Sequence, residues 1–135
     1  MATKKSETTN SNANYSATIN EASRDFSPKE RIMMKDTSDA IHLDEATRVD
    51  AIVVKPVAWA VLDIHNEKSE DKDYQNFIII DENGQKYVTG SKSFWSSFRG
   101  IYDEMNGSDE EWGIKIFSSP SKNYKGKSFI TCSLV

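Results

Sequence analysis

Residues that could bind a phosphate backbone gather in the last 24 residues of the chain, Trp112–Val135. This segment has no carboxylate side chain, although the protein as a whole is acidic, and its four lysines are Lys115, Lys122, Lys125 and Lys127. Tyr124 stands among three of them. Cationic tips on mobile side chains attract phosphates, and flat aromatic rings stack on exposed nucleobases. The composition suits contact with a single-stranded nucleic acid, although most loops of this composition are plain solvated loops, so the case depends on the surrounding elements.

Two predicted strands, Trp112–Ser118 and Ser128–Val135, hold these residues on a hairpin. Because side chains alternate between the two faces of a strand, Lys115 and Phe117 share the face opposite to the isoleucines of the first strand. A phenylalanine that faces outward beside a lysine is either a stacking platform or part of a patch that another element covers. The hairpin is thus predicted to present Phe117 and Lys115 next to the basic loop.

Two further tyrosines, Tyr87 and Tyr74, are candidates for base stacking. Tyr87 alternates with Lys86 and Val88 in a predicted strand, so it faces the ligand if Val88 belongs to the core. The opposite assignment buries Tyr87. Tyr74 begins the preceding strand and has the same two alternatives. Trp59 shares a strand face with two valines, which favours the core or a subunit contact.

Length and charge set limits on these interpretations. A chain of 135 residues has room for one domain and little more. The net charge of −4 argues against a generally basic nucleic-acid binder. The acidic residues cluster in Glu67–Asp73, Asp81–Glu82 and Asp103–Glu111, so one face of the domain can still be basic.

The first part of the chain, residues 1–24, is predicted to be a disordered polar arm. Half of its positions are Ser, Thr or Asn, and it has few large apolar side chains, such as Tyr15 and Ile19. Such a segment buries too little apolar surface to offset the entropy of ordering it. The arm is a candidate for self-association with a neighbouring copy.

Residues 25–47 are predicted to form a short helix and a linker. Ser27 is a preferred N-cap, Pro28 suits the first helical position, and Glu30 completes a capping box, so a helix should run to about Lys35. This helix and the segment that follows it could dock on their own domain or on another copy.

The remaining residues, 48–135, show the element order of an OB-fold, a small five-stranded β-barrel. A run broken by Pro56 is followed by two strands joined through an Asn-Gly turn, by an amphipathic helix and by the hairpin. The predicted elements before the hairpin are Ala51–Ile64, Tyr74–Ile80, Gln85–Thr89 and the helix Ser91–Asn106. The fold class is therefore mainly β, in the order β-β-β-α-β-β. In this fold the loop that joins strands 4 and 5 contacts oligonucleotides, and the basic loop occupies that connection.

Enzymatic and metal-binding functions lack support in the sequence. His42 and His65 have no metal-ligand spacing, and a single cysteine, Cys132, cannot build a zinc site or a disulfide framework. Cys132 is predicted to pack as a small apolar residue. No cofactor motif is present, and Ser119–Lys122 matches a Ser-x-x-Lys motif without its companion motifs. No apolar stretch is long enough to span a membrane, and a cytoplasmic location is expected.

From Tyr74 onward the sequence resembles the small single-stranded DNA-binding proteins of phages and conjugative plasmids of Gram-positive bacteria. The resemblance rests on Phe77–Tyr87 with its Asp-Glu-Asn-Gly turn, on Thr89–Ser91 before Phe94-Trp95, and on Pro120–Lys127 followed by Phe129. It covers about half of the chain. It implies an OB-fold that coats single strands during replication or transfer without strong sequence preference.

The resemblance implies binding roles for Lys122, Tyr124, Lys125 and Lys127, together with Phe117 and Tyr87. Cellular relatives end in an acidic tail that recruits other enzymes, and this sequence ends at Cys132-Ser133-Leu134-Val135, so that role is not expected. Two alternatives remain: an accessory or inhibitor protein whose OB-like barrel binds another protein, and an RNA-binding protein.

Overall fold

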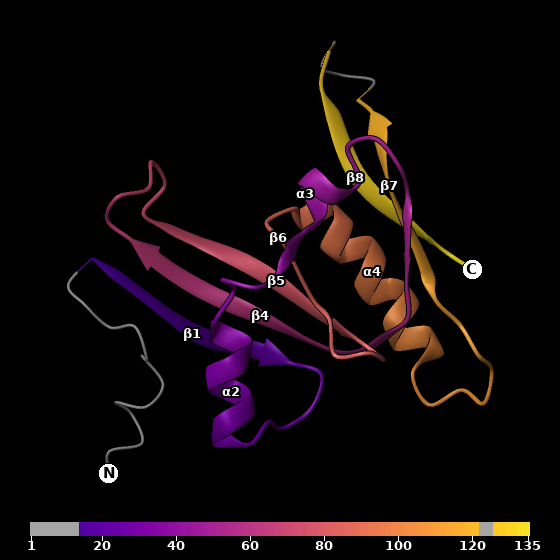
Figure 1. The fold of residues 1–135 in the computed structure, drawn as a ribbon, viewed down its shortest axis with the longest axis horizontal. Coiled ribbons are helices and arrows are strands. Elements are labelled where there is room, and N and C mark those ends of the chain that lie inside the picture. The colour runs from indigo at the N-terminus through magenta and orange to yellow at the C-terminus, as the bar shows by residue number, and fades with distance from the viewer. Residues whose placement is uncertain (1–13, 122–125) are drawn as a thin grey trace.

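The computed structural model describes residues 14–121 and 126–135, and their strands form two sheets (Figure 1). The larger sheet has the order β1-β4-β5-β6-β2, and the smaller one has the order β3-β7-β8. The strands are β1 Tyr15–Ala22, β2 Ile41–His42, β3 Ile52–Val54, β4 Pro56–Asn66, β5 Asp73–Asp81, β6 Lys86–Thr89, β7 Ile114–Pro120 and β8 Ser128–Leu134. The helices are α2 Pro28–Lys35, α3 Leu43–Ala46 and α4 Lys92–Met105.

One predicted strand takes part in both sheets. The run Ala51–Ile64 divides at Lys55-Pro56, where proline removes a backbone donor, into β3 and β4. The first piece pairs with β7 and the second with β5, both antiparallel. This division joins the two sheets and places the β7–β8 hairpin beside the start of β4.

The domain is mainly β, as predicted, but the described strands do not close into a five-stranded barrel. Closure would require β6 to pair with β8, and the two strands lie in different sheets. The free edge of β6 is instead occupied by β2, which pairs with it in parallel through Ile41–Tyr87 and His42–Val88. The segment predicted to be a linker thus caps the edge that would close the barrel.

The prediction of a disordered arm is wrong for Tyr15–Ala22, which forms β1 and pairs with β4 along its whole length. Residues 1–13 lie outside the described part of the chain. Ala17 is buried on one face of this strand, and Tyr15 and Ile19 pack beside it. The hydrogen bonds that order β1 come from β4, so a segment with little apolar content still becomes a strand. The folded unit therefore begins well before residue 48.

Helix α2 forms as predicted and docks on its own domain. The Ser27 hydroxyl accepts a hydrogen bond from the Glu30 backbone N–H, and the Glu30 carboxylate accepts one from the Ser27 N–H, which completes the capping box. Bonds from Arg24 and Ser27 lower the pKa of Glu30 to about 2. At the other end, the buried Lys86 ammonium donates to the backbone oxygens of Met33 and Asp36. A cation at a helix C-terminus is stabilising, so Lys86 of β6 fastens α2 to the sheet.

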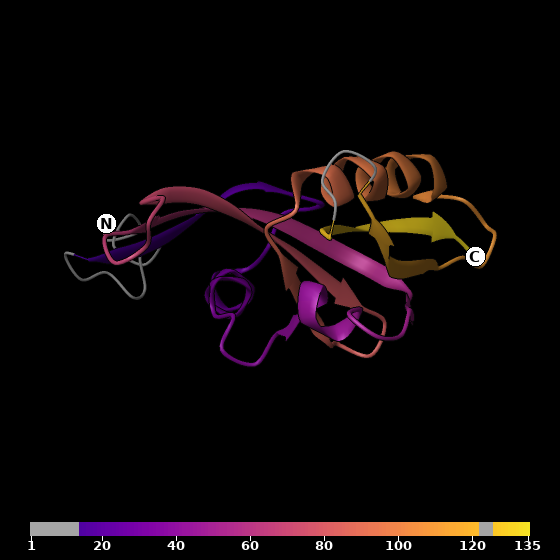
Figure 2. The same ribbon diagram turned by 90° about the horizontal axis from the view of Figure 1, so that it is seen from above.

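Two apolar clusters lie on opposite faces of the larger sheet, one beneath α4 and the other beneath α2 (Figure 2). The predicted aromatic stripe of α4 is buried in the first cluster, and its members are Phe94, Trp95, Phe98 and Tyr102. Trp59 is buried among them, which settles its two alternatives in favour of the core. The Arg99 guanidinium carbon lies 3.9 Å from the centre of the Trp59 ring, and Arg99 also pairs with Glu21 of β1.

Candidate nucleic-acid interface

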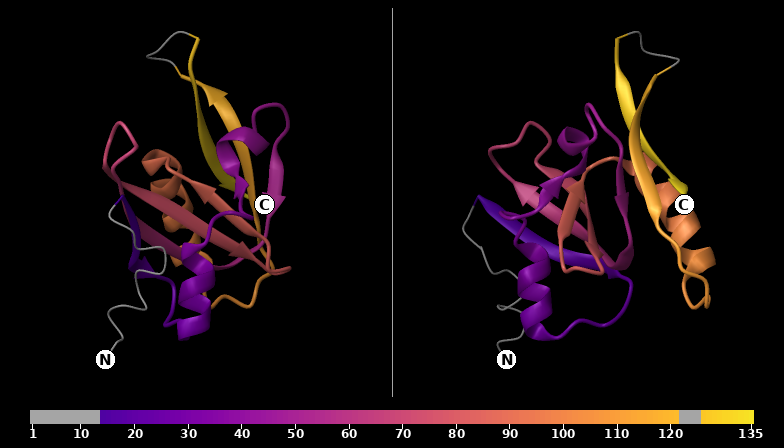
Figure 3. Two further views of the ribbon diagram at one scale, coloured as in Figure 1. Left: turned by 60° about the vertical axis from the view of Figure 1, so that its left-hand side comes forward. Right: turned by 45° about the vertical axis from the view of Figure 1, so that its right-hand side comes forward.

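The β7–β8 hairpin extends away from the rest of the molecule (Figure 3). Ile114 and Ile116 face inward and are fully buried, which places Lys115 and Phe117 on the outer face, as alternation predicts. None of the three strands β3, β7 and β8 contains a carboxylate. The outer face of this sheet is therefore cationic and partly aromatic, although the protein carries a net charge of −4.

Two phenylalanines shape this outer face. Phe117 pairs across the strands with Thr131, and Phe129 pairs with Ser119, so the two phenylalanines are diagonal neighbours on one face. Phe129 is 43% exposed, and Phe117 is partly buried. The Lys115 ammonium lies 5.9 Å from the centre of the Phe117 ring, within range of a cation–π contact. We name Lys115, Phe117, Phe129 and Lys127 the outer hairpin face.

Phe129 belongs to the sequence pattern on which the resemblance rests, but the binding residues predicted from that pattern do not include it. The strand alternation contains the missing signal, since Phe129 has the opposite orientation to Ile130 and Cys132, which are buried. Of the predicted loop residues, Lys127 is exposed at the start of the returning strand. Lys122, Tyr124 and Lys125 lie outside the described residues.

A further cation, Arg48, reaches the hairpin from the segment between α3 and β3. Arg48 and Lys127 line a hollow of about 520 Å³, and its other lining residues in the described part of the chain are Ser118, Ser119, Pro120, Ser121, Gly126 and Ser128. None of these lining residues carries a carboxylate. The Arg48 side chain has no hydrogen-bond or ion-pair partner among the described residues. No sequence signal points to Arg48, because only the fold brings the segment between α3 and β3 to the loop end of the hairpin.

Tyr87 does not belong to this interface, so its prediction as a stacking residue is wrong. The residue is only 8% exposed, packs in the cluster beneath α4, and donates its hydroxyl proton to Asp81 Oδ2 at 2.9 Å. Burial and the Asp81 carboxylate raise the pKa of Tyr87 to about 12. All four residues of β6 are buried, because both faces of this strand are covered.

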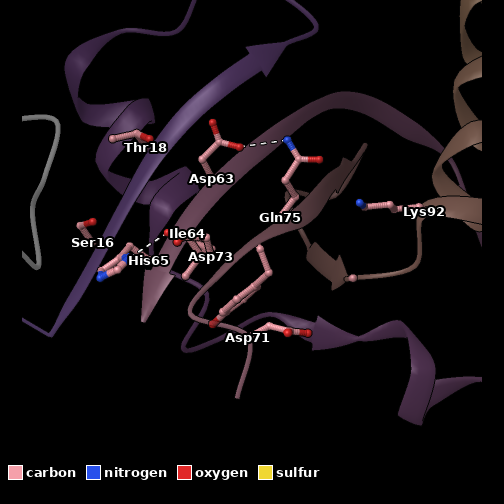
Figure 4. Close-up of a pocket in the computed structure, with 11 residues that line it drawn as sticks. Ser16, Thr18, Asp63, Ile64, His65, Asp71, Asp73, Gln75 and Lys92 are labelled. Carbon is pink, nitrogen blue, oxygen red and sulfur yellow. Dashed lines mark hydrogen bonds and ion pairs between the residues drawn. The ribbon is translucent and has the colours of Figure 1, made fainter. Parts of the chain in front are cut away.

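Tyr74 is far from the hairpin in the sheet order and does not join the outer hairpin face. It is partly buried against the apolar cluster beneath α2 and lines a polar hollow of about 630 Å³ on the larger sheet (Figure 4). This hollow is the larger of the two, but Asp63, Asp71 and Asp73 line it. Its carboxylates repel phosphates, so the outer hairpin face is the better candidate for nucleic acid.

Hydrogen bonds hold two carboxylates of this hollow, Asp63 and Asp73, in place. Asp63 accepts hydrogen bonds from Asn20 and Gln75 at 2.8 and 2.9 Å. The Nδ1 atom of His65 lies 2.7 Å from Asp73 Oδ1 (Figure 4). Its Nε2 atom lies 2.5 Å from Glu67 Oε2, so the ring lies between the two carboxylates. Glu67 begins the loop between β4 and β5, and Asp73 is the first residue of β5, so the hydrogen bonds of His65 connect the two ends of that loop.

The pKa of His65 is raised above 6.5 by its hydrogen bonds to Asp73 and Glu67. A raised folded-state pKa contributes stability that is complete below pH 6.5 and is lost as the pH rises through the folded value. We expect the urea midpoint to fall over that window and the His65→Gln variant to lack this component. An NMR titration of His65 checks the pKa directly, and a value below 6.5 contradicts the arrangement.

The chain matches no protein-family model, no curated protein and no solved structure. Function must therefore be argued from the site itself. Among residues 14–121 and 126–135, no group of three or more histidine, cysteine or acidic side chains could hold a metal ion. Within the same residues, no helix combines the length and the apolar character needed to cross a bilayer. Cys132 is buried, as predicted, and burial raises its thiol pKa to about 11.

Proposed function

We propose that the protein binds single-stranded DNA without sequence preference, through lysine–phosphate contacts and base stacking on the outer hairpin face. The observation that carries the proposal is the pairing of exposed cations with Phe117 and Phe129 on a sheet that has no carboxylate. Stacking tolerates any base because every base has a flat face, and lysines follow the backbone whatever the sequence. The role is binding, not catalysis, in the cytoplasm, in the replication or transfer of phage or plasmid DNA.

The sheet topology supports an open variant of the OB-fold as the scaffold. An OB-fold is a partly open Greek-key barrel that binds oligonucleotides through its second and third strands and the loops joining strands 1–2 and 4–5. Here a bent first strand, β3 with β4, pairs with both β5 and β7, and α4 lies between β6 and β7 in the chain. The β7–β8 connection then corresponds to the loop joining strands 4 and 5.

Fluorescence anisotropy of a labelled oligo-dT, titrated with the protein at low and moderate salt, tests the proposal. We expect salt-sensitive binding that an unlabelled duplex of equal length does not displace. Lys115→Ala should reduce the slope of log affinity against log salt by about 0.7, the value for one phosphate contact on a single strand. Lys29→Ala is the matched control. Lys29 is exposed on α2, and its substitution removes the same charge.

The acidic hollow favours one alternative, an accessory protein that binds a basic protein surface. Asp63, Asp71 and Asp73 line it, and it opens on a face of the larger sheet distinct from the hairpin. Absence of binding to oligo-dT at micromolar protein in low salt would contradict the DNA proposal and favour this alternative. Competition between DNA and RNA strands of the same sequence decides between the two nucleic acids.

A further inference from the structure

We infer that the hollow at the loop end of the hairpin, with Arg48 among its cations, is a binding site for a backbone phosphate of the single strand. This inference rests on the proposed function, and it adds a residue outside the predicted binding loop. It also specifies which part of the ligand the hollow contacts.

The backbone at Arg48 is held by its neighbours, whereas the side chain is not. Arg48 follows α3, where Leu43 is fully buried in the cluster beneath α4 and Thr47 is 2% exposed. The Thr47 hydroxyl donates to the Leu43 carbonyl at 2.8 Å, and the Arg48 backbone N–H donates to the Glu45 carbonyl at 3.2 Å. Buried neighbours therefore fix the start of an arginine whose guanidinium has no protein partner among the described residues. The backbone that carries Arg48 is fixed, and its exposed guanidinium remains available to an anion.

The chemistry of the lining suits a phosphate diester. Hydroxyl groups of Ser118 and Ser128 and the cations Arg48 and Lys127 are donors, and the lining has no carboxylate to compete with an anion. Other hollows on the described surface differ, since they contain carboxylates such as Asp25, Asp39 and Asp63. Arginine presents a planar fork of N–H groups that matches two phosphate oxygens, which lysine cannot do.

The position of the hollow predicts the path of the strand. Its lining combines residues of both faces at the loop end of the hairpin, Ser119 and Lys127 from the outer face and Ser118 and Ser128 from the opposite face. Bases stacked on Phe117 and Phe129 would then lie next to the hollow, and a neighbouring phosphate would lie near Arg48. The strand is expected to run along the outer face toward the loop end of the hairpin.

Arg48→Ala, measured in the full chain by anisotropy, tests the inference. We expect affinity for oligo-dT to fall about tenfold and the salt slope to decrease by about 0.7, as for one lost charge-assisted phosphate contact. Arg48→Lys should recover part of the affinity. An abasic strand of equal length should show the same loss for Arg48→Ala, because it retains its phosphates. Melting temperatures should not change, since Arg48 is exposed.

The outcomes separate the two proposals. If the wild-type protein binds neither strand, the DNA-binding proposal and the Arg48 site are both overturned. If the wild-type protein binds and Arg48→Ala weakens binding no more than Lys29→Ala, only the Arg48 site is overturned, because a change of net charge then accounts for the effect. If Arg48→Ala weakens binding to oligo-dT but not to the abasic strand, Arg48 contacts a base, and its assignment to a phosphate is overturned.

Discussion

Residues 48–135 on their own are expected to lack a cooperative unfolding transition. The fragment loses Phe26 and Met34 from the cluster beneath α2 and Leu43 from the cluster beneath α4, all of which are buried in the whole chain. At about 1.5–3 kcal/mol for each buried side chain, these three account for about 5–9 kcal/mol. A domain of this size is stable by about 5–15 kcal/mol. Circular dichroism of the fragment in increasing urea is the measurement.

Two adjacent methionines of α2 provide a matched pair that tests how much the N-terminal elements contribute to stability. Met34 is 4% exposed and Met33 is 56% exposed. We expect Met34→Ala to cost about 2–5 kcal/mol of unfolding free energy, as for other methionines cut back in a core. Met33→Ala should change it by less than about 0.5 kcal/mol. Equal losses for the two variants, or a fragment 48–135 that unfolds cooperatively near the full chain's midpoint, would contradict the role assigned to the N-terminal elements.

Local signals predicted the elements that local interactions determine. The capping box of Ser27 and Glu30 depends on groups three residues apart, and the stripe of α4 follows its own helical period. The turn at Asn83-Gly84 was predictable because glycine adopts a positive φ at little cost. In the structure Gly84 has a φ of +82°. The β7–β8 hairpin and the orientation of Lys115 and Phe117 also follow from alternation within one segment.

Elements that depend on distant partners were not predictable in the same way. The strand Tyr15–Ala22 is ordered by pairing with β4, and its own sequence gives little sign of that partner. Alternation in β6 separates Tyr87 from Val88 but does not decide which of them is covered, and here both are buried. Arg48 reaches the hairpin only because α3 docks in the core. The missed features therefore share one cause, long-range packing.

Loss of the two aromatic side chains of the outer hairpin face is expected to have the largest effect on affinity. Phe117→Ala and Phe129→Ala should each weaken binding to oligo-dT by about 5- to 150-fold, because one stacked base contributes about 1–3 kcal/mol. The double variant should lose about the product of the two effects if each ring stacks on its own base. Diagonal neighbours that share one base would instead give a smaller loss than the product.

Val53→Ala is the matched control for these variants. Val53 lies on β3 opposite Lys115, on the outer face of the same sheet, and is 62% exposed, so the change removes apolar surface without removing an aromatic ring. We expect no measurable change in affinity for Val53→Ala. The phenylalanine variants should also bind an abasic strand as well as the wild type does, whereas Arg48→Ala should not. Equal losses on abasic and base-bearing strands would show that Phe117 and Phe129 support the hairpin and do not stack on bases. That result would leave the cations alone as the source of binding, and affinity would then depend on salt and not on the presence of bases.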